Sequence, residues 1–153
     1  MESKMESKIP IPVFKVFLVR ENPEPYEIIK INSPQETVSV IREYLKFADR
    51  EHFGVLMLNN KNEIIGITTV SIGTINASFA VAREVYKPAI LAGATAILVF
   101  HNHTSSDPSP SEEDIKTTHN LQQAGQILGI KLLDHIIVSA SQTYYSFAEN
   151  RLL

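Results

Sequence analysis

The longest apolar run in the sequence, residues 89–100 (AILAGATAILVF), stops abruptly at His101-Asn102-His103. The run is shorter than the roughly 18 to 20 apolar residues that span a bilayer, so we assign it to a protein core. Its second half, residues 95–100, is short, apolar and rich in β-forming residues, which is typical of a central strand covered on both faces. This stretch therefore predicts a sheet with a packed layer on each side.

The rest of the chain supplies neighbours for that strand. The predicted strands cover residues 14–19, 26–31, 53–58, 64–72, 95–100, 131–139 and 143–147, the first two as an edge hairpin. The predicted helices cover residues 34 to about 47, 82 up to Gly93, and 112–128. The first helix is expected to start with Ser33 as its cap and Glu36 reaching back, and the last to stop at Gly129. This order predicts an α/β (α+β mixed) fold, a mixed sheet flanked by helices.

Length and composition limit the function classes. The chain has 153 residues and fits a single domain, which we place at residues 11–153, after a disordered tail at residues 1–10 (beginning MESKMESK) that lacks the apolar region of a secretory signal. The net charge is −3 without a long Lys/Arg cluster, so strong nonspecific binding of nucleic acid is not indicated. The absence of cysteine excludes disulfides and thiolate ligands and fits a reducing cytoplasm.

The two histidines after the central strand carry the strongest sign of chemistry. Residues i and i+2 of an extended segment point to the same side, so His101 and His103 can present two imidazole nitrogens to one point. Zinc accepts such ligands and commonly takes a carboxylate as a third, for which Asp114 is the candidate. The intervening loop is long enough to turn the chain back, and Ser111 caps the helix whose first turn holds Asp114. Three protein ligands leave a fourth position for water, the pattern of a catalytic site.

Each part of this pattern also has a structural interpretation. A bare His-x-His by itself favours two structural histidines over a metal site, and Ser111-x-x-Asp114 resembles a capping box with Asp in place of Glu. Capping does not conflict with metal binding. The combined spacing falls at a strand-to-helix loop, where α/β architectures tend to carry active sites, and it is much more specific than either part.

The segment HNHTSSDPSPSEED resembles the JAMM (MPN+) metalloprotease motif, in the form HNHPSGDPxPSxxD of its bacterial RadC-like branch. AREVYKPAILAGATAILVFHNH and LLDHIIVS…YYSFAE are similar to the segments around that motif, so the resemblance covers roughly residues 42–150. Thr104 stands where the family usually has Pro, and Ser106 where it usually has Gly. If that position is built for Gly, Ser106 has a positive φ. The helix-hairpin-helix region of full-length RadC proteins has no counterpart, so we expect a form with the catalytic domain alone.

The resemblance implies an MPN/JAB-like fold with cytidine-deaminase-like layering and one Zn²⁺ per chain, bound by the three ligands named above. Glu51, at the start of a strand, matches the glutamate that acts on the metal-bound water. Ser111 matches the serine that donates a hydrogen bond to the developing oxyanion. His135 also matches a family position, and either supports the site or is a hydrogen-bonded core histidine.

Other polar residues compete less well. His52 alternates with Glu51 along a strand and should face the opposite side. His119 lies about 140° around a helix from Asp114, which is too far to share its metal. Asp107 fits a turn-forming role better than a ligand role. Two further glutamates are expected in a hairpin turn and on a helix (Glu63 and Glu84).

The sequence therefore predicts a zinc-dependent hydrolase of the JAMM type, a metallopeptidase or isopeptidase that cleaves an amide bond with a zinc-activated water. We expect a peptide or protein substrate, no membrane contact and a homodimer formed through a sheet edge or a helix face. The RadC resemblance also implies a second class, a DNA-repair factor or metal-dependent nuclease, for which the acidic chain lacks an obvious phosphate-binding surface. A silent scaffold domain is the third class, against which the intact site set argues: Glu51, His101, His103, Ser111 and Asp114.

Overall fold

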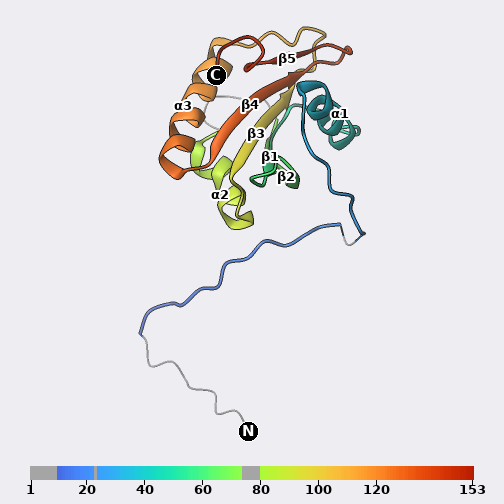
Figure 1. Cartoon of the computed structure of the whole chain (residues 1–153). Coiled ribbons are helices and arrows are strands. Elements are labelled where there is room, and N and C mark those ends of the chain that lie inside the picture. The colour runs from blue at the N-terminus through green and yellow to red at the C-terminus, as the bar shows by residue number, and fades with distance from the viewer. Residues whose placement is uncertain (1–9, 23, 74–79) are drawn as a thin grey trace.

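The computed structural model describes residues 10–22, 24–73 and 80–153, which form five strands and three helices (Figure 1). In chain order these are α1 (Pro34–Tyr44), β1 (His52–Leu58), β2 (Ile64–Ile72), α2 (Ala82–Ala92), β3 (Ala96–Asn102), α3 (Glu112–Leu128), β4 (Lys131–Val138) and β5 (Tyr144–Ser146). Apart from the N-terminal hairpin, every element predicted from the sequence is present close to its predicted bounds.

The strands form one mixed sheet in the order β2-β1-β3-β4-β5. The central strand, β3, is antiparallel to β1 and parallel to β4. A tight turn cannot join parallel neighbours, so the chain between β3 and β4 crosses over as α3. The hairpin of β1 and β2 closes at a polar turn in which Asn62 has a φ of 60°. The predicted fold class, a mixed sheet flanked by helices, is confirmed.

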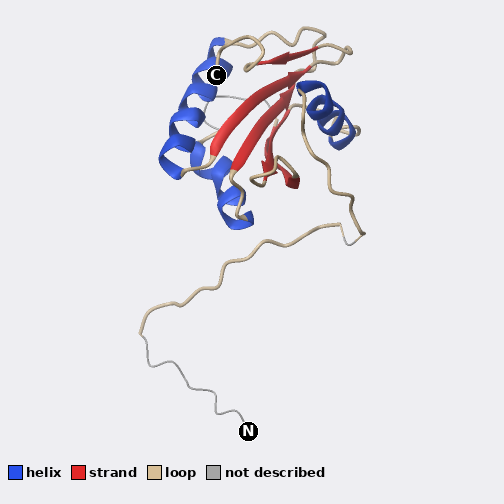
Figure 2. Ribbon diagram, viewed as in Figure 1, coloured by secondary structure: helices blue, strands red, loops and turns tan. Residues whose placement is uncertain are grey.

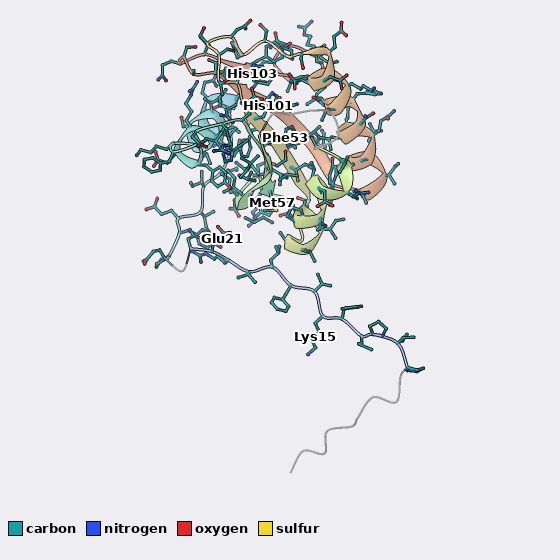
Figure 3. The ribbon with its side chains drawn as sticks, turned by 180° about the vertical axis from the view of Figure 1, so that it is seen from behind. Lys15, Glu21, Phe53, Met57, His101 and His103 are labelled. Carbon is teal, nitrogen blue, oxygen red and sulfur yellow. The ribbon has the colours of Figure 1, made fainter. Side chains whose placement is uncertain are left out.

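Helices cover both faces of the sheet, with α1 on one face and α2 and α3 on the other (Figures 1 and 2). Side chains of β3 alternate between the two layers, because successive residues of a strand point to opposite sides. Val99 packs in the cluster that contains Leu121 of α3, whereas Leu98 packs in the cluster that contains Ile41 of α1. The same alternation puts His101, two residues after Val99, on the face of α2 and α3. There it stacks on Phe53 of β1, with ring centroids 5.9 Å apart (Figure 3).

Short-range signals set the helix ends. Ser33 caps α1 by accepting the N–H of Glu36, whose carboxylate in turn accepts the N–H of Asn32 at 2.7 Å rather than that of Ser33 itself. Both α2 and α3 end at a glycine, Gly93 with a φ of 68° and Gly129 with a φ of 70°. This left-handed conformation is disfavoured for a residue with a Cβ, which is why the sequence pattern marks these ends well.

The predicted edge hairpin between residues 14 and 31 is wrong. The described residues before Lys30 form no strand, and Phe14 is 79% exposed. The segment that carries Lys15 and Glu21 runs away from the sheet (Figures 1 and 3), and a single bridge at Lys30 joins it to the residue before β2. A two-stranded hairpin is marginal unless it packs on further structure, and local β-propensity does not supply that structure.

The structure bears only partly on the predictions about the N-terminal tail and about membrane contact. The predicted disorder of residues 1–10 falls, except for Pro10, outside the described residues, and the domain start at residue 11 stays a prediction. Among the described residues, no helix is both long and apolar enough to cross a membrane.

Candidate metal centre

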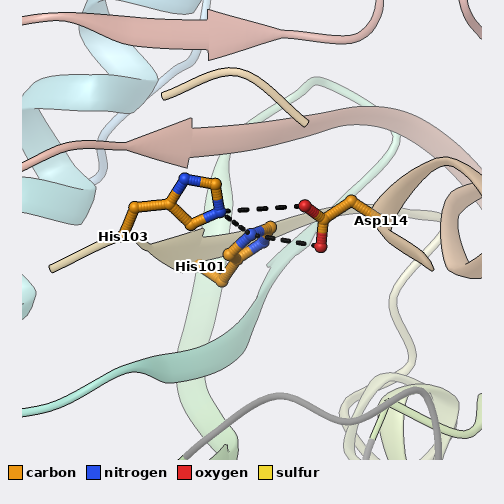
Figure 4. A group of neighbouring side chains, drawn as sticks. All are labelled: His101, His103 and Asp114. Atoms are coloured by element: carbon orange, nitrogen blue, oxygen red, sulfur yellow. Dashed lines mark hydrogen bonds and ion pairs between the residues drawn. The ribbon is translucent and has the colours of Figure 1, made fainter. Parts of the chain in front are cut away.

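The three residues predicted as metal ligands meet at one end of the sheet (Figure 4). His101 is the last residue but one of β3, His103 follows the strand, and Asp114 lies in the first turn of α3. One nitrogen from each histidine and one carboxylate oxygen lie within 4.8 Å of one another. His101 and Asp114 are buried and His103 is half-buried. Strand alternation and the helix cap thus bring together the three side chains that the sequence singled out.

A hydrogen bond on its far side decides which nitrogen of His103 faces the centre. Its Nδ1 lies 3.0 Å from the carbonyl oxygen of Asp107. A carbonyl only accepts, so Nδ1 of the neutral ring carries the proton and Nε2 carries a lone pair. That Nε2 lies 3.0 Å from Nε2 of His101 and 3.7 Å from Oδ2 of Asp114. A second contact of 3.4 Å joins Nε2 of His101 to Oδ1 of Asp114.

The centre therefore gathers more hydrogen-bond acceptors than donors. A ring lone pair and a carboxylate at these distances repel one another unless a cation or a shared proton lies between them. Two imidazoles and one carboxylate are metal ligands that zinc accepts, and in a tetrahedral site they leave one coordination position open. The residues present fit a metal ion.

Asp114 is held by the cap of its own helix. Ser111 Oγ accepts the N–H of Asp114 at 3.1 Å, and Asp114 Oδ2 accepts the N–H of Ser111 at 2.8 Å. Burial raises the pKa of Asp114, but the side chains of His101 and His103 and the Ser111 N–H together outweigh it and hold the pKa well below its usual value. The carboxylate is therefore ionised. The predicted capping box and the predicted ligand role involve the same aspartate without conflict.

His103 lies on the loop side of the centre. The Asp114 side chain, 3.7 Å from Nε2 of His103, raises the pKa of His103 above the usual 6.5, although partial burial opposes this. The Asp107 carbonyl and the charge of Glu51 add to the rise. The Asp107 side chain accepts the N–H of Ser109 at 2.9 Å, which is the turn role predicted for it. Its carboxylate lies outside the ligand group.

Glu51 precedes β1, and the register between β1 and β3 places it. Phe53 of β1 lies opposite His101 of β3. The paired residues end there, and continuing the register by two residues predicts that Glu51 lies opposite His103, on the face that carries both histidines. The effect of the Glu51 charge on the pKa of His103 agrees with this position.

Asn102, between the two histidines, is a residue that the sequence analysis missed. Its Oδ1 accepts the N–H of His52 at 2.7 Å, and its Nδ2 donates to the carbonyl of Arg50 at 3.0 Å. These two peptide groups flank Glu51, so a single side-chain amide holds the backbone on both sides of that residue. The only sequence signal was an amide, able to donate and accept, at the end of a strand.

His135, on β4, satisfies both interpretations left open by the sequence. It is completely buried and stacks on Phe147 with ring centroids 4.7 Å apart. Its Nε2 lies 2.8 Å from Nδ1 of His101, and its Nδ1 lies 2.6 Å from Oγ1 of Thr118 on α3. Burial, and then the nearby His101, hold the pKa of His135 well below 6.5. It is a core histidine that contacts His101 from behind.

The remaining histidines lie away from the centre, as predicted. His52 lines a groove with Tyr44 at the end of α1, on the other face of the sheet from Phe53. His119 is exposed on α3 and does not belong to the ligand group.

Known proteins with similar sequences point to one family. A family model described as RadC-like JAB domain matches residues 31–152. A UPF0758 protein of Desulfitobacterium hafniense (strain DSM 10664 / DCB-2) is 45% identical over 123 residues, which are 80% of this chain and 54% of the relative. A UPF0758 protein of Staphylococcus haemolyticus is 47% identical over 123 residues, with the same 80% and 54% coverage. A UPF0758 protein of Caldanaerobacter subterraneus is 47% identical over 112 residues, 73% of this chain and 48% of the relative. The chain thus spans about half the length of these curated relatives.

Proposed function

Because the chain belongs to the RadC-like JAB domain family, we propose that it is a zinc-dependent hydrolase that cleaves an amide bond in a peptide or protein. The convergence of His101, His103 and Asp114 within 4.8 Å at the end of β3 carries this proposal. Two imidazoles and one carboxylate with an open position suit a catalytic zinc ion. Imidazole and carboxylate ligands also suit other divalent metals, so the identity of the metal is part of the test.

The reaction divides into a metal contribution and a contribution from the chain's own side chains. A zinc ion bound there would lower the pKa of a coordinated water to about 7 and would polarise a carbonyl, which is what amide hydrolysis requires. The Glu51 carboxylate accepts a proton from the attacking water and passes it to the nitrogen of the leaving amine. The Ser111 hydroxyl donates a hydrogen bond to the carbonyl oxygen of the substrate as negative charge develops there.

The positions of Glu51 and Ser111 support these roles. Glu51 is half-buried just before β1, and the extended register of β1 with β3 predicts that it lies near His103, which its effect on the His103 pKa supports. Ser111 is exposed, and its oxygen already accepts the N–H of Asp114. A hydroxyl oxygen that accepts one bond can still donate its own proton, so helix capping leaves Ser111 free to bind a substrate oxygen.

A metal-dependent nuclease or DNA-repair factor is the alternative from another class. The net charge of −3 and the lack of a long Lys/Arg cluster weigh against it, because phosphate contacts supply most of the affinity for nucleic acid. DNA therefore belongs in the assay as the competing substrate.

The test combines metal analysis with a panel of substrates. Purified protein is analysed for zinc, then incubated with a peptide library and separately with single- and double-stranded DNA. We expect one zinc per chain and cleavage of peptides. Cleavage of DNA without cleavage of peptides would replace the proposed reaction with the alternative.

A glutamate variant separates the chemistry from the fold. Glu51→Gln should keep zinc and fold but lose about 10²–10⁴-fold in turnover, because an amide cannot accept the proton. The matched control is Glu63→Gln, which makes the same change in the turn at the opposite end of β1 and should turn over at the parent rate. Parent activity in Glu51→Gln would show that another group acts as the base.

The predicted homodimer and the predicted cytoplasmic location stay predictions. The segment before Lys30 exposes several large apolar side chains, among them Phe14, Phe17 and Val19. Self-association would remove such side chains from water. Light scattering that finds only monomer at high protein concentration would contradict the homodimer.

A further inference from the structure

His135 occupies a place that the proposed reaction does not use. Its ring lies behind His101 and packs between two aromatic rings, stacked on Phe147 and edge-on to Phe53. Within the described residues, no carboxylate hydrogen-bonds to its ring, and each ring nitrogen has one polar partner, His101 on one side and Thr118 on the other. These two contacts, and not a neighbouring charge, determine which ring nitrogen of His135 and of His101 carries the proton.

The arrangement starts at the backbone of Asp114. Thr118 Oγ1 lies 2.6 Å from the carbonyl oxygen of Asp114, one turn earlier in α3. A carbonyl can only accept, so the single hydroxyl proton of Thr118 points to it. The Thr118 oxygen must then accept at its other contact, where Nδ1 of His135 lies 2.6 Å away. His135 therefore carries its proton on Nδ1.

The consequence passes on to the ligand. A neutral imidazole has one N–H, so Nε2 of His135 bears a lone pair and accepts from Nδ1 of His101 at 2.8 Å. His101 is then protonated on Nδ1, and its Nε2 lone pair faces His103 and Asp114. Each assignment, from Thr118 through His135 to His101, follows because a hydroxyl or a neutral imidazole has only one proton to donate.

We propose that His135 and Thr118 are positioning residues that hold His101 in the tautomer whose Nε2 can bind a metal ion. The inference deepens the proposed function and rests on it, because it assigns His101 as a ligand. The relay begins at the carbonyl of Asp114 and ends at His101, so it ties two of the three ligand residues to one network inside the core. A partner of this kind orients a metal-binding imidazole and fixes its tautomer.

Thr118→Val is the decisive variant because it keeps the shape of a buried side chain and replaces only the hydroxyl, with a methyl group. His135 then has no acceptor at Nδ1 and is expected to move its proton to Nε2. Nε2 of His135 then donates to Nδ1 of His101, so the proton of His101 lies on its Nε2. That proton occupies the position at which a metal ion would bind. Thr118→Ser retains the hydroxyl and should retain the relay.

The first measurement is made on metal-free protein. Long-range ¹⁵N–¹H correlation spectra of the histidine rings report which nitrogen of each ring carries the proton. We expect His101 and His135 of the parent protein to be protonated on Nδ1, and the proton of His101 to move to Nε2 in Thr118→Val. A parent spectrum with His101 protonated on Nε2 would overturn the inference, whatever the variants do.

The second measurement is zinc affinity by competition with a chromophoric chelator. Thr118→Val should bind zinc about 10–100-fold more weakly, the usual effect of losing a residue that supports a ligand. Thr118→Ser, and Thr117→Val as the same change one residue earlier in α3, should stay close to the parent affinity. Parent affinity in Thr118→Val would also overturn the inference. If the parent protein shows the expected tautomers and binds no zinc, the proposed function fails and the proton relay stands.

Discussion

The two histidines of the candidate metal centre are identical residues two positions apart, yet the protein supports them in different ways. His101 belongs to β3, is 1% exposed, and is held by His135 and Phe53 inside the core. His103 lies beyond the strand with its side chain 19% exposed, and is held by the backbone carbonyl of Asp107. A packed core relaxes only partly around a lost group, whereas a surface loop adapts. A substitution of His101, in the core, should therefore lower the free energy of unfolding more than the same substitution of His103, in the loop.

Removing each ring in turn should produce the largest difference. Both His101→Ala and His103→Ala should lose stoichiometric zinc, because each removes one of three ligands. Only His101→Ala should strongly destabilise the metal-free protein, by about 2–4 kcal/mol, since it opens a cavity in the core. His103→Ala should cost under about 1 kcal/mol. Elemental analysis measures the zinc, and urea unfolding with a chelator present measures the stability.

Two results would contradict this difference. Undiminished zinc in a His101→Ala/His103→Ala double variant would remove both residues as ligands. Equal loss of stability in the two single variants would show that the loop supports His103 as firmly as the core supports His101.

The pH dependence should show opposite signs for stability and for metal binding. The pKa of His103 lies above 6.5, chiefly because of the nearby Asp114 side chain. In metal-free protein its protonated ring contributes stability that is fully present below the unfolded pKa and is lost as pH rises through the raised pKa. Zinc requires the neutral ring, so its affinity should fall as pH falls through that same pKa, by about tenfold per unit for one competing proton.

Chelator competition and urea unfolding across this pH window give the two curves. Zinc affinity that does not change while His103 takes up its proton would exclude His103 as a ligand. Asp114 stays ionised throughout the window, because its own pKa is held well below the usual value.

A smaller effect is expected at Asn102, whose side chain holds the backbone on both sides of Glu51. Asn102→Ala removes both hydrogen bonds to the peptide groups around Glu51. Zinc content should stay unchanged, while amide exchange at His52 should become about fivefold faster, as expected for a lost hydrogen bond of about 1 kcal/mol. Turnover of any identified substrate should fall. Asn120→Ala, on the exposed side of α3, is the matched control, and equal exchange rates in both variants would show that Asn102 does not hold Glu51.

The smallest effect is expected in the loop itself. The positive φ expected for Ser106 is wrong, because the described non-glycine residues with positive φ are Asn62 and Arg151. Ser106→Gly therefore relieves no strain, and by loosening the unfolded chain it should destabilise the protein by about 0.4–1 kcal/mol. Zinc content should not change. A gain in unfolding temperature would mean that the loop is strained in some other way.

Much of the site was predictable because its signals are local. The alternation of a strand puts His101 and His103 on one side, and a capping pattern of four residues orients Asp114. The glycines at the ends of α2 and α3 act through their own φ angles. These effects operate within a few residues. The sequence alone therefore determined how the two histidines and the aspartate are oriented and where the helices around them begin and end.

Tertiary structure decided what depends on pairing between distant segments. His135 meets His101 only because β4 lies parallel to β3 in a register that sets Val99 opposite His135. Likewise the N-terminal segment has strong β-propensity, yet the described part of it adds no strand to the sheet, because propensity does not choose a partner strand. Strand register and partner choice come from burial summed over the whole sheet, which no short stretch of sequence contains. That is why the candidate metal ligands could be predicted from one segment, whereas the contacts of the proposed proton relay behind them are visible only in the folded chain.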